Sequence, residues 1–371
     1  MKLPIPAEEQ FRAPAHHERV TSKIGLALAI TFTTCFVTGL LSHLIQHPPG
    51  WFWWPSRPAG LYRVTQGLHV ICGIASIPLL LAKLWSVYPK LFGRPLVRSL
   101  PHALERLSIL VLSGAAFFEL TTGLLNVAQN YPWGFYFPQV HYAVAWLAIG
   151  SILVHVAVKL PVIRRALSRA TVEDPPAEGL SRRGFLVTTG LATGVAVVAT
   201  AGATVPFLRG VSGLSWKTGK GTQNLPVNRT AAAAGITWSA AWRLSVVTPR
   251  GTTKFSLDEL RALPQTTAEL PIACVEGWSQ SATWRGISLP MLLKAVGAAP
   301  GAAVRVSSSE RGGLYGVSVL PGEHTADELT LLALELNGEV LAPDHGFPCR
   351  IIAPNRPGVL QTKWVTKLEV L

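Results

Sequence analysis

The chain has 371 residues, enough for two or three domains, and 49% of them are apolar against 14% charged. This balance is typical of a membrane protein and not of a soluble enzyme. The formal charge of +13 would suit a nucleic-acid partner, but most lysines and arginines flank apolar stretches. Membrane topology therefore accounts for the charge, and no nucleic acid is expected.

Five apolar segments, taken in chain order, are each long enough to cross a bilayer, which needs about 20 residues. The basic residues between them gather on alternate sides, whereas the loops at 46–65 and 128–139 are rich in aromatic residues. This pattern predicts a protein of the cytoplasmic membrane with its N-terminus inside and its C-terminal part outside. The predicted spans are residues 24–45, 66–87, 107–127, 140–162 and 185–208.

Histidines stand at matched depth near the outer ends of the second and fourth spans. Two neutral imidazoles that face each other across a helix bundle form a site for haem b, so His69 and His141 are predicted to bind haem iron. Hydrogen bonding to backbone or lipid headgroups is the alternative. His43, near the outer end of the first span, is a rival ligand. His155 lies 14 residues after His141, roughly 21 Å along the axis, and would suit a second haem, for which no inner partner is evident.

The first four spans resemble the membrane cytochrome b superfamily that includes the b-type subunits of formate dehydrogenase and hydrogenase. The resemblance implies that His141 and His155 are a pair of ligand positions. Quinone or quinol in the bilayer is the expected electron partner of the haem.

A pair of arginines precedes the fifth span, in the sequence SRRGFL at residues 181–186. Paired arginines before a moderately apolar helix are the address of the twin-arginine export machinery, which moves folded proteins. The pair therefore predicts that a cofactor enzyme follows and is delivered outside the membrane. A basic flank of an ordinary helix is the alternative interpretation.

Beyond a polar linker at residues 219–223, the pattern changes to short alternating segments separated by turns rich in glycine and proline. This pattern predicts a mixed α+β domain. The predicted strands are residues 242–247, 303–307, 316–320, 350–353 and 368–371, and the predicted helices are 256–262 and 289–296.

An ordered set of motifs from residue 244 to 371 resembles the molybdopterin-binding domain of the sulfite oxidase family. The motifs are ACVEGW (273–278), WRGISL (284–289), YGVS (315–318), NGEVL (337–341), HGFPCR (345–350) and KWV (363–365). The resemblance implies that Cys274 gives a thiolate to molybdenum beside the two sulfurs of one pterin, and a soft thiolate suits such a metal. A Cys274–Cys349 disulfide is the competing interpretation, and it would abolish the metal site.

The pterin carries a phosphate, which cationic side chains or backbone amides must receive. The resemblance implies Arg285, His345, Arg350, Arg356 and Lys363 as candidates, Asn228 as a further pterin contact, and Tyr315 as a residue that approaches the metal. Sulfite oxidases place an arginine immediately before the metal cysteine. Here that position is Ala273, which disfavours sulfite as the substrate.

The expected fold is thus a membrane α-helical bundle of four spans plus a fifth linking span, followed by a mixed α+β, sulfite-oxidase-like domain. The expected function is oxygen-atom transfer on a small-molecule substrate, coupled to quinone and haem b. A non-catalytic haem protein with a degenerate, cofactor-free domain and a histidine-bearing transporter are the alternatives. The expected parts are a cytoplasmic segment (1–22), a four-span domain (23–165), a cytoplasmic linker (166–180), the export signal with the fifth span (181–209) and the exported domain (210–371).

Overall fold

The computed structural model describes residues 13–93, 95, 97–168, 180–215, 221–313 and 315–371. Most of the expected N-terminal segment and of the 166–180 linker, and part of the polar linker at 219–223, therefore lie outside the described residues. Contacts divide the chain into two compact units. The first holds the chain up to Leu40, Leu68–Gly202 and Phe207–Trp216, and the second holds Leu41–Gly67, Ala203–Pro206 and Lys217–Leu371.

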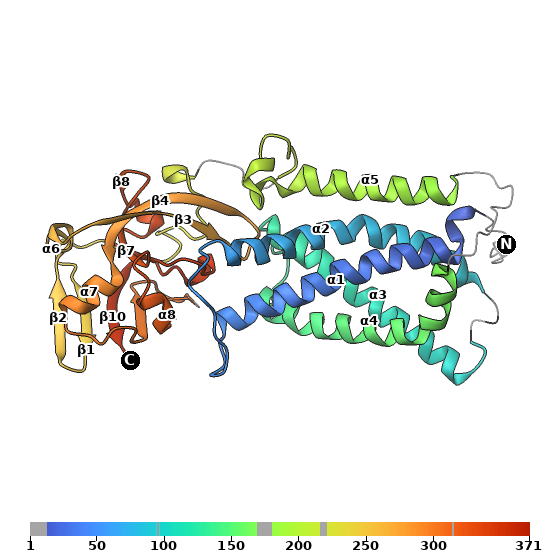
Figure 1. Cartoon of the computed structure of the whole chain (residues 1–371), viewed down its shortest axis with the longest axis horizontal. Helices are drawn as coiled ribbons and strands as arrows, with labels where there is room; N and C mark the ends of the chain where they lie inside the picture. Colours follow the sequence, from blue (N-terminus) through green and yellow to red (C-terminus); the bar gives the residue numbers. More distant parts are fainter. Residues whose placement is uncertain (1–12, 94, 96, 169–179, 216–220, 314) are drawn as a thin grey trace. The chain divides into compact units, whose positions relative to one another are not determined.

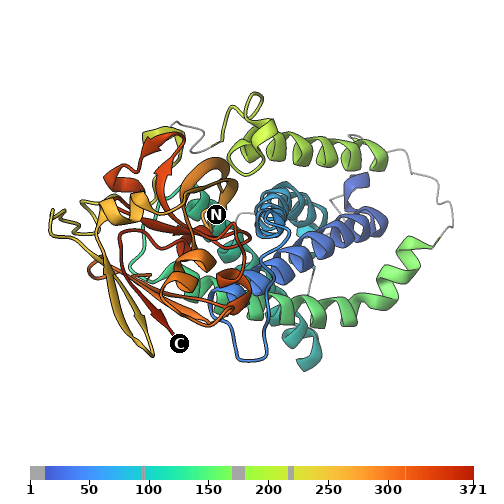
Figure 2. The same cartoon turned by 60° about the vertical axis from the view of Figure 1, so that its left-hand side comes forward.

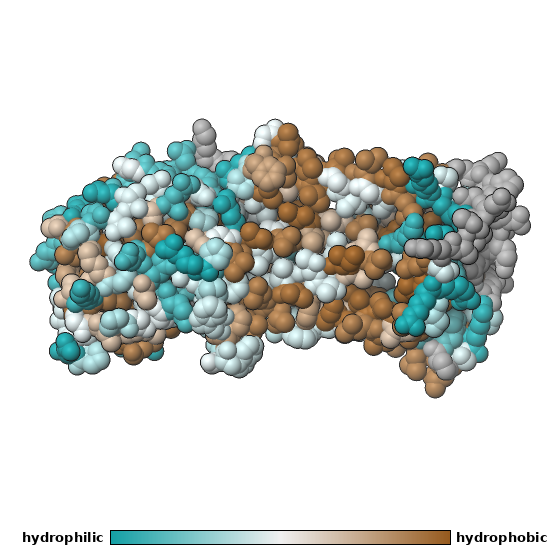
Figure 3. Space-filling view, in the orientation of Figure 1, coloured by the Kyte–Doolittle hydropathy of each residue, from teal (hydrophilic) through white to brown (hydrophobic). Residues whose placement is uncertain are grey.

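Five helices are long and apolar enough to cross a membrane, so the helices that the sequence predicts are confirmed. Their outward side chains are apolar, as at Leu110, Leu153 and Val195, and Figure 3 shows this apolar surface in brown. A contiguous apolar surface of this extent suits a lipid environment and not water. The helices are α1 (Glu18–Gln46), α2 (Leu61–Val87), α3 (Leu100–Val127), α4 (Phe137–Leu167) and α5 (Arg182–Thr200).

Within the first unit, α3 and α4 pack along each other, as Figure 1 shows. Helix α5 begins directly at the arginine pair, because the Ser181 side chain accepts a hydrogen bond from the Gly184 N–H at 3.0 Å and caps the helix. Phe185 and Leu186 on α5 then pack against Val20, Ile24 and Leu79. The fifth helix thus belongs to the same apolar unit.

The second unit is built on two five-stranded sheets with different strand orders. Sheet A has the order β2-β1-β10-β5-β6, and sheet B has β3-β4-β7-β8 with β9 also paired to β7. The β1–β2 hairpin and the long β3–β4 ribbon are visible in Figures 1 and 2. The strands are β1 (Leu244–Thr248), β2 (Gly251–Phe255), β3 (Thr266–Ala273), β4 (Ser279–Ser288), β5 (Val304–Ser308), β6 (Val317–Leu320), β7 (Leu331–Leu336), β8 (Glu339–Val340), β9 (Arg350–Ile352) and β10 (Val365–Val370).

Three short helices complete the second unit: α6 (Leu257–Ala262), α7 (Leu289–Ala295) and α8 (Gly322–Thr325). A capping box starts α6, because Ser256 and Glu259 each bond the other's backbone N–H. Each predicted strand and helix of this domain is present, and a mixed α+β domain is confirmed. The expected pattern lacked β2, β3, β4, β7 and β8, so the sheets are larger than the sequence alone indicated.

Candidate cofactor sites

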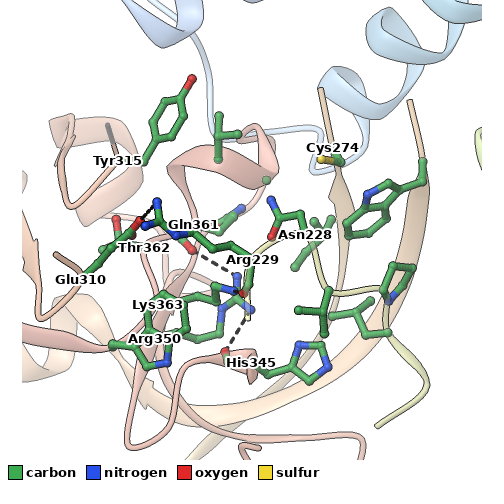
Figure 4. A pocket seen from close by; sticks show the side chains of 18 residues that line it. Asn228, Arg229, Cys274, Glu310, Tyr315, His345, Arg350, Gln361, Thr362 and Lys363 are labelled. Carbon is green, nitrogen blue, oxygen red and sulfur yellow. Dashed lines mark hydrogen bonds and ion pairs between the residues drawn. The ribbon is translucent and has the colours of Figure 1, made fainter. Parts of the chain in front are cut away.

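One pocket of the second unit gathers most of the predicted cofactor residues (Figure 4). Its empty volume is about 720 Å³, part of which is open to solvent. In Figure 4, Cys274 lies at one end of the pocket and the basic side chains lie together away from it. The predicted residues that line it are Asn228, Cys274, Tyr315, His345, Arg350 and Lys363.

Cys274 lies in the tight turn between β3 and β4. Its N–H donates to the Trp278 carbonyl at 2.8 Å, and the Gly277 N–H donates back to the Cys274 carbonyl at 3.0 Å. Gly277 has φ 92°, a left-handed conformation that glycine adopts without strain. The turn therefore fixes the backbone of Cys274 while its side chain lines the pocket.

Cys349 lies elsewhere, in the core that the two sheets share, and is fully buried. Both cysteines are thiols, so the alternative of a Cys274–Cys349 disulfide is wrong. Burial raises the pKa of the Cys349 thiol above its ordinary value, which makes this thiol unreactive. Cys274 is also buried, but it lines the pocket, whereas Cys349 is not among the residues that line it.

The basic end of the pocket is held together by hydrogen bonds to backbone carbonyls. The Lys363 ammonium donates to the Arg229 carbonyl at 2.6 Å and to the Asp344 carbonyl at 2.9 Å. The Arg350 guanidinium donates to the carbonyls of His345 and Gln361, each at 3.1 Å. These bonds orient the two cations without neutralising them.

Gly346 allows the two cationic residues to approach each other. It has φ 108°, and a Cβ there would lie 3.1 Å from the Cβ atoms of both Arg350 and Lys363. Any other residue at this position would be strained and would push the two side chains apart. The glycine of the HGFPCR motif thus has a direct role in the shape of the site.

Burial makes the positive charge of this cluster unfavourable in the isolated protein. Burial, assisted by Arg350, lowers the pKa of Lys363 to about 7. Burial lowers the pKa of Arg350 to about 9 and that of His345 to about 4. An anion bound in the pocket would reverse these shifts, because an opposite charge favours the protonated forms.

The arrangement fits a pterin with a phosphate group. The Nε of Arg350 is buried and has no hydrogen-bond partner within the described residues, so one donor of the basic cluster is available to a ligand. Among these residues, no group of three or more His, Cys, Asp or Glu could hold a metal ion. A metal at Cys274 would therefore take its remaining ligands from a cofactor, as a dithiolene pterin provides.

Two of the predicted phosphate contacts lie outside this pocket. Arg285 on β4 forms an ion pair with Glu335 at 2.8 Å, and its side chain is half exposed. Arg356 is buried, and its guanidinium donates to the Val319 carbonyl at 3.1 Å. Both arginines serve contacts within the domain in this structure.

The pocket also contains residues that the sequence interpretation missed. Arg229 lies next to the predicted Asn228 and forms an ion pair with Glu310 at 2.6 Å, drawn as a dashed line in Figure 4. Gln361 holds the neighbouring loop through hydrogen bonds to Ala353 at 2.8 and 2.7 Å. The available signal was the pair of polar residues, Gln361 and Thr362, directly before the KWV motif.

A second candidate site lies in the first unit, between α2, α3 and α4. The rings of His69 and His141 lie 6.4 Å apart between centroids. The Nδ1 of His69 lies 2.9 Å from the Cys35 carbonyl, and the Nδ1 of His141 lies 3.1 Å from the Thr122 hydroxyl. The Nδ1 of His69 has a carbonyl acceptor for its proton, so its Nε2 keeps a lone pair for a metal. The Nε2 of His141 lies 3.1 Å from the Glu119 carboxylate, a contact that a metal would have to replace.

Small residues lie against both rings. A Cβ on Gly39 would lie 3.0 Å from the Cε1 of His69, and one on Gly123 would lie 3.8 Å from the Cε1 of His141. An iron between two imidazoles, with bonds of about 2 Å, places the rings roughly 6 Å apart. The 6.4 Å between the ring centroids is close to this value, and the two ring planes stand at 69° to each other.

The sequence interpretation missed Glu119, a buried acid on α3. Its carboxylate lies 3.1 Å from the Nε2 of His141. An acidic residue within an apolar span is itself a signal of function, because its burial is costly. The remaining histidine candidates have other surroundings: the His43 ring lies 5.0 Å from that of His47, and His155 lies near the other end of α4.

Comparison with known proteins agrees with the domain geometry. Residues 231–371 match the family model of the oxidoreductase molybdopterin binding domain. This part of the chain is therefore a molybdopterin-binding oxidoreductase domain, and the prediction of a molybdopterin-dependent oxidoreductase is confirmed for it.

Individual relatives give the same result over a similar length. An uncharacterized oxidoreductase, YuiH of Bacillus subtilis, is 30% identical over 31% of this chain and 57% of its own. Sulfite oxidase of Arabidopsis thaliana is 28% identical over 32% of this chain and 38% of its own. YedZ1 of Azospira oryzae, provisionally named a subunit of protein-methionine-sulfoxide reductase, is 30% identical over 31% of this chain and 43% of its own. The chain thus spans about half the length of these relatives.

Proposed function

We propose that the protein is a membrane-anchored molybdenum oxidoreductase that transfers an oxygen atom to or from a small sulfur or nitrogen compound. The observation that carries this proposal is the pocket itself. A thiol that is not in a disulfide lies at one end, and a cluster of buried cations lies at the other. This is the donor set that a molybdenum pterin with a phosphate group needs.

The residues divide into two roles. Cys274 would bind the metal, and Lys363 and Arg350 would bind the phosphate of the pterin. Bound molybdenum would supply two-electron oxygen-atom transfer, which protein side chains cannot perform. Tyr315 and Asn228 line the same pocket and are the candidates to orient substrate or cofactor there.

Electrons would pass between this centre and quinone in the bilayer by way of haem b bound to His69 and His141. The 6.4 Å ring separation and the hydrogen bond of the His69 Nδ1 to the Cys35 carbonyl support this assignment. A single haem at this pair is the simplest arrangement, because His155 has no second histidine beside it among the interactions of the described residues.

The haem assignment predicts a specific spectroscopic loss. Replacing His69 or His141 by alanine is expected to remove the b-type absorbance of the reduced protein, whereas His47→Ala should leave it unchanged. The measurement is a reduced-minus-oxidised optical spectrum of the purified full chain. Full absorbance in both His69→Ala and His141→Ala would contradict the assignment.

Export of the C-terminal domain, residues 210–371, would follow from the arginine pair that begins α5. Changing Arg182 and Arg183 together to lysine keeps the charge but removes the twin-arginine address. We expect the C-terminal domain of this variant to stay on the cytoplasmic side of the membrane. There it is protected from protease added to intact spheroplasts. Lys23→Arg is the matched control, and equal protease access in the double variant would exclude this route.

The decisive test of the function is metal content together with the optical spectrum, on the wild type and on Cys274→Ser. Molybdenum in the wild type and its loss in the variant would support the proposal, and wild-type protein without molybdenum would refute it.

A histidine-bearing transporter is the second candidate, and the contact between Glu119 and His141 favours it. A carboxylate and an imidazole at 3.1 Å within an apolar bundle can share a proton. Absence of haem absorbance in carefully isolated protein would support this candidate over the cytochrome.

A further inference from the structure

The segment Leu41–Gly67, between the first two apolar helices, clusters with the oxidoreductase domain and not with the helical unit. It contains the end of α1, a loop and the first turns of α2. Its partners in the domain lie about 300 positions further along the chain, as for Trp54 and Asn355. A connection between two apolar helices thus forms part of the second unit.

Asn355 is the centre of this contact, and it is almost completely buried. Its side-chain oxygen accepts from the Tyr62 N–H at 2.6 Å, and its side-chain amide donates to the Pro55 carbonyl at 2.6 Å. Its backbone carbonyl accepts from the Trp54 indole at 2.8 Å, and its N–H donates to the Ala59 carbonyl at 3.1 Å. All four hydrogen bonds of one residue therefore go to this segment.

The bond to Tyr62 has a particular physical meaning. Helix α2 begins at Leu61, so the Tyr62 N–H is one of the first donors of the helix and has no acceptor within it. Asn355 supplies that acceptor from a distant part of the same chain, and its side chain thus serves as an N-cap for α2. A second anchor lies nearby, where Arg57 binds Asp327 with two hydrogen bonds of 2.8 and 2.9 Å.

The same segment contacts the turn that carries Cys274. Tyr62 packs with Ile45 and Ala273 in one buried cluster. The Gln66 side chain donates to the carbonyl of Val275, at 3.4 Å. In Figure 4 the pale blue ribbon of the early chain passes beside the Cys274 end of the pocket.

The loop that carries Asn355 reaches the same turn from its other side. Pro357 forms an isolated parallel bridge with Ala273. A Cβ on Gly358 would lie 3.3 Å from the Ala273 carbonyl and 3.5 Å from the Cα of Cys274. The 274–278 turn thus lies between the Asn355 loop and the Leu41–Gly67 segment, which are hydrogen-bonded to each other.

We propose that Asn355 and the Leu41–Gly67 segment form a clamp that positions Cys274 for the metal. This inference deepens the proposed function and rests on it only in treating Cys274 as the metal ligand. Asn355 is then a positioning residue, because it acts on the cysteine through Tyr62 and the neighbouring loop.

The test is hydrogen exchange of the full chain in detergent, with Asn355→Gly, which removes the side chain and tolerates the φ of 55°. Two buried hydrogen bonds are lost, so the Cys274 and Gly277 amides should exchange roughly tenfold faster. Amides in the β10–β5 pairing should keep their rates. Asn337→Gly is the matched control, because Asn337 also has a positive φ of 53° and bonds the Thr283 N–H through its side chain at 3.0 Å.

Unchanged exchange of the 274–278 turn in Asn355→Gly would overturn the clamp. If Asn355→Gly loses protection from exchange throughout the domain, the Arg57→Ala variant becomes the test of the clamp, because the Arg57 side chain is exposed. It should speed exchange of the turn about twofold to threefold, and no change would refute the inference.

Hydrogen exchange can be measured in protein with or without molybdenum, so the two proposals can fail separately. Protein without molybdenum that still shows the local effect would refute the proposed function and support the clamp. Protein that contains molybdenum but lacks the local effect on exchange would support the proposed function and refute the clamp. The electron paramagnetic resonance signal of reduced molybdenum, where present, should change in Asn355→Gly and stay constant in Asn337→Gly.

Discussion

Replacing Cys274 by serine is expected to lower molybdenum-dependent turnover by at least about 100-fold. Loss of residues that merely orient a metal ligand already costs about 10–100-fold in affinity or activity, and loss of the ligand itself costs at least as much. A hydroxyl is a poorer partner than a thiolate for a soft metal centre. The 274–278 turn keeps its backbone hydrogen bonds in this variant, so the fold should persist.

The measurement is reduction of dimethyl sulfoxide or trimethylamine N-oxide by the full chain with a reduced viologen dye, alongside molybdenum content. Cys349→Ala is the matched control. Cys349 is buried in the core between the sheets, so its loss should reduce the free energy of unfolding by about 1–2 kcal/mol. Turnover per molybdenum should remain at the wild-type value. Retained turnover in Cys274→Ser would remove the basis of the proposed site.

The sequence predicted the elements that depend on local pattern. Long apolar runs gave five helices, and the ordered motifs located Cys274, His345, Arg350 and Lys363 in what proves to be one pocket. These predictions succeed because helix length follows from hydropathy and because the motif residues surround one cofactor pocket.

Strands were missed where their sequence conflicts with simple strand rules. Pro271 lies within β3 and argues against a central strand. Among the described strands β3 lies at the edge of its sheet beside β4, and proline is tolerated in an edge strand. Arg285 was predicted to reach the phosphate because it lies inside a motif. Residues alternate between the two faces of β4, so Trp284 points into the core and Arg285 points outward to Glu335.

Contacts between distant parts of the chain had no local signal. Nothing in the loop around Trp54 indicates Asn355 as its partner, because the pairing depends on the folded surface of the other segment. Glu119 is a different case. Its position within an apolar span was visible in the sequence, and a systematic search for charges at membrane depth would have found it.

Removing the charge of Lys363 is expected to weaken cofactor retention and to change how stability depends on pH. A hydrogen bond to a charged group contributes about 1.5–3 kcal/mol, so Lys363→Met should retain the cofactor roughly 10–100-fold less tightly. The side chain of methionine has a similar length and leaves the pocket wall in place. Molybdenum content after dialysis of the purified full chain measures this loss.

The pH effect has a definite sign in the cofactor-free protein. Burial lowers the pKa of folded Lys363 to about 7, whereas an unfolded lysine has a pKa of about 10.4. Between these values the unfolded state binds a proton that the folded state lacks, so the free energy of unfolding rises with pH. Below pH 7 both states are protonated, and the contribution of Lys363 to the slope disappears.

Chemical denaturation of the full chain at pH 7, 8 and 9 checks this expectation. The rise with pH should be flatter in Lys363→Met and unaffected in Arg285→Met, whose parent side chain is half exposed and lies outside the pocket. It should also be flatter in cofactor-loaded wild type, because the phosphate favours the ammonium form and raises its pKa. If the free energy of unfolding of Lys363→Met rises with pH as steeply as that of cofactor-free wild type, the Lys363 ammonium is not the source of this pH dependence.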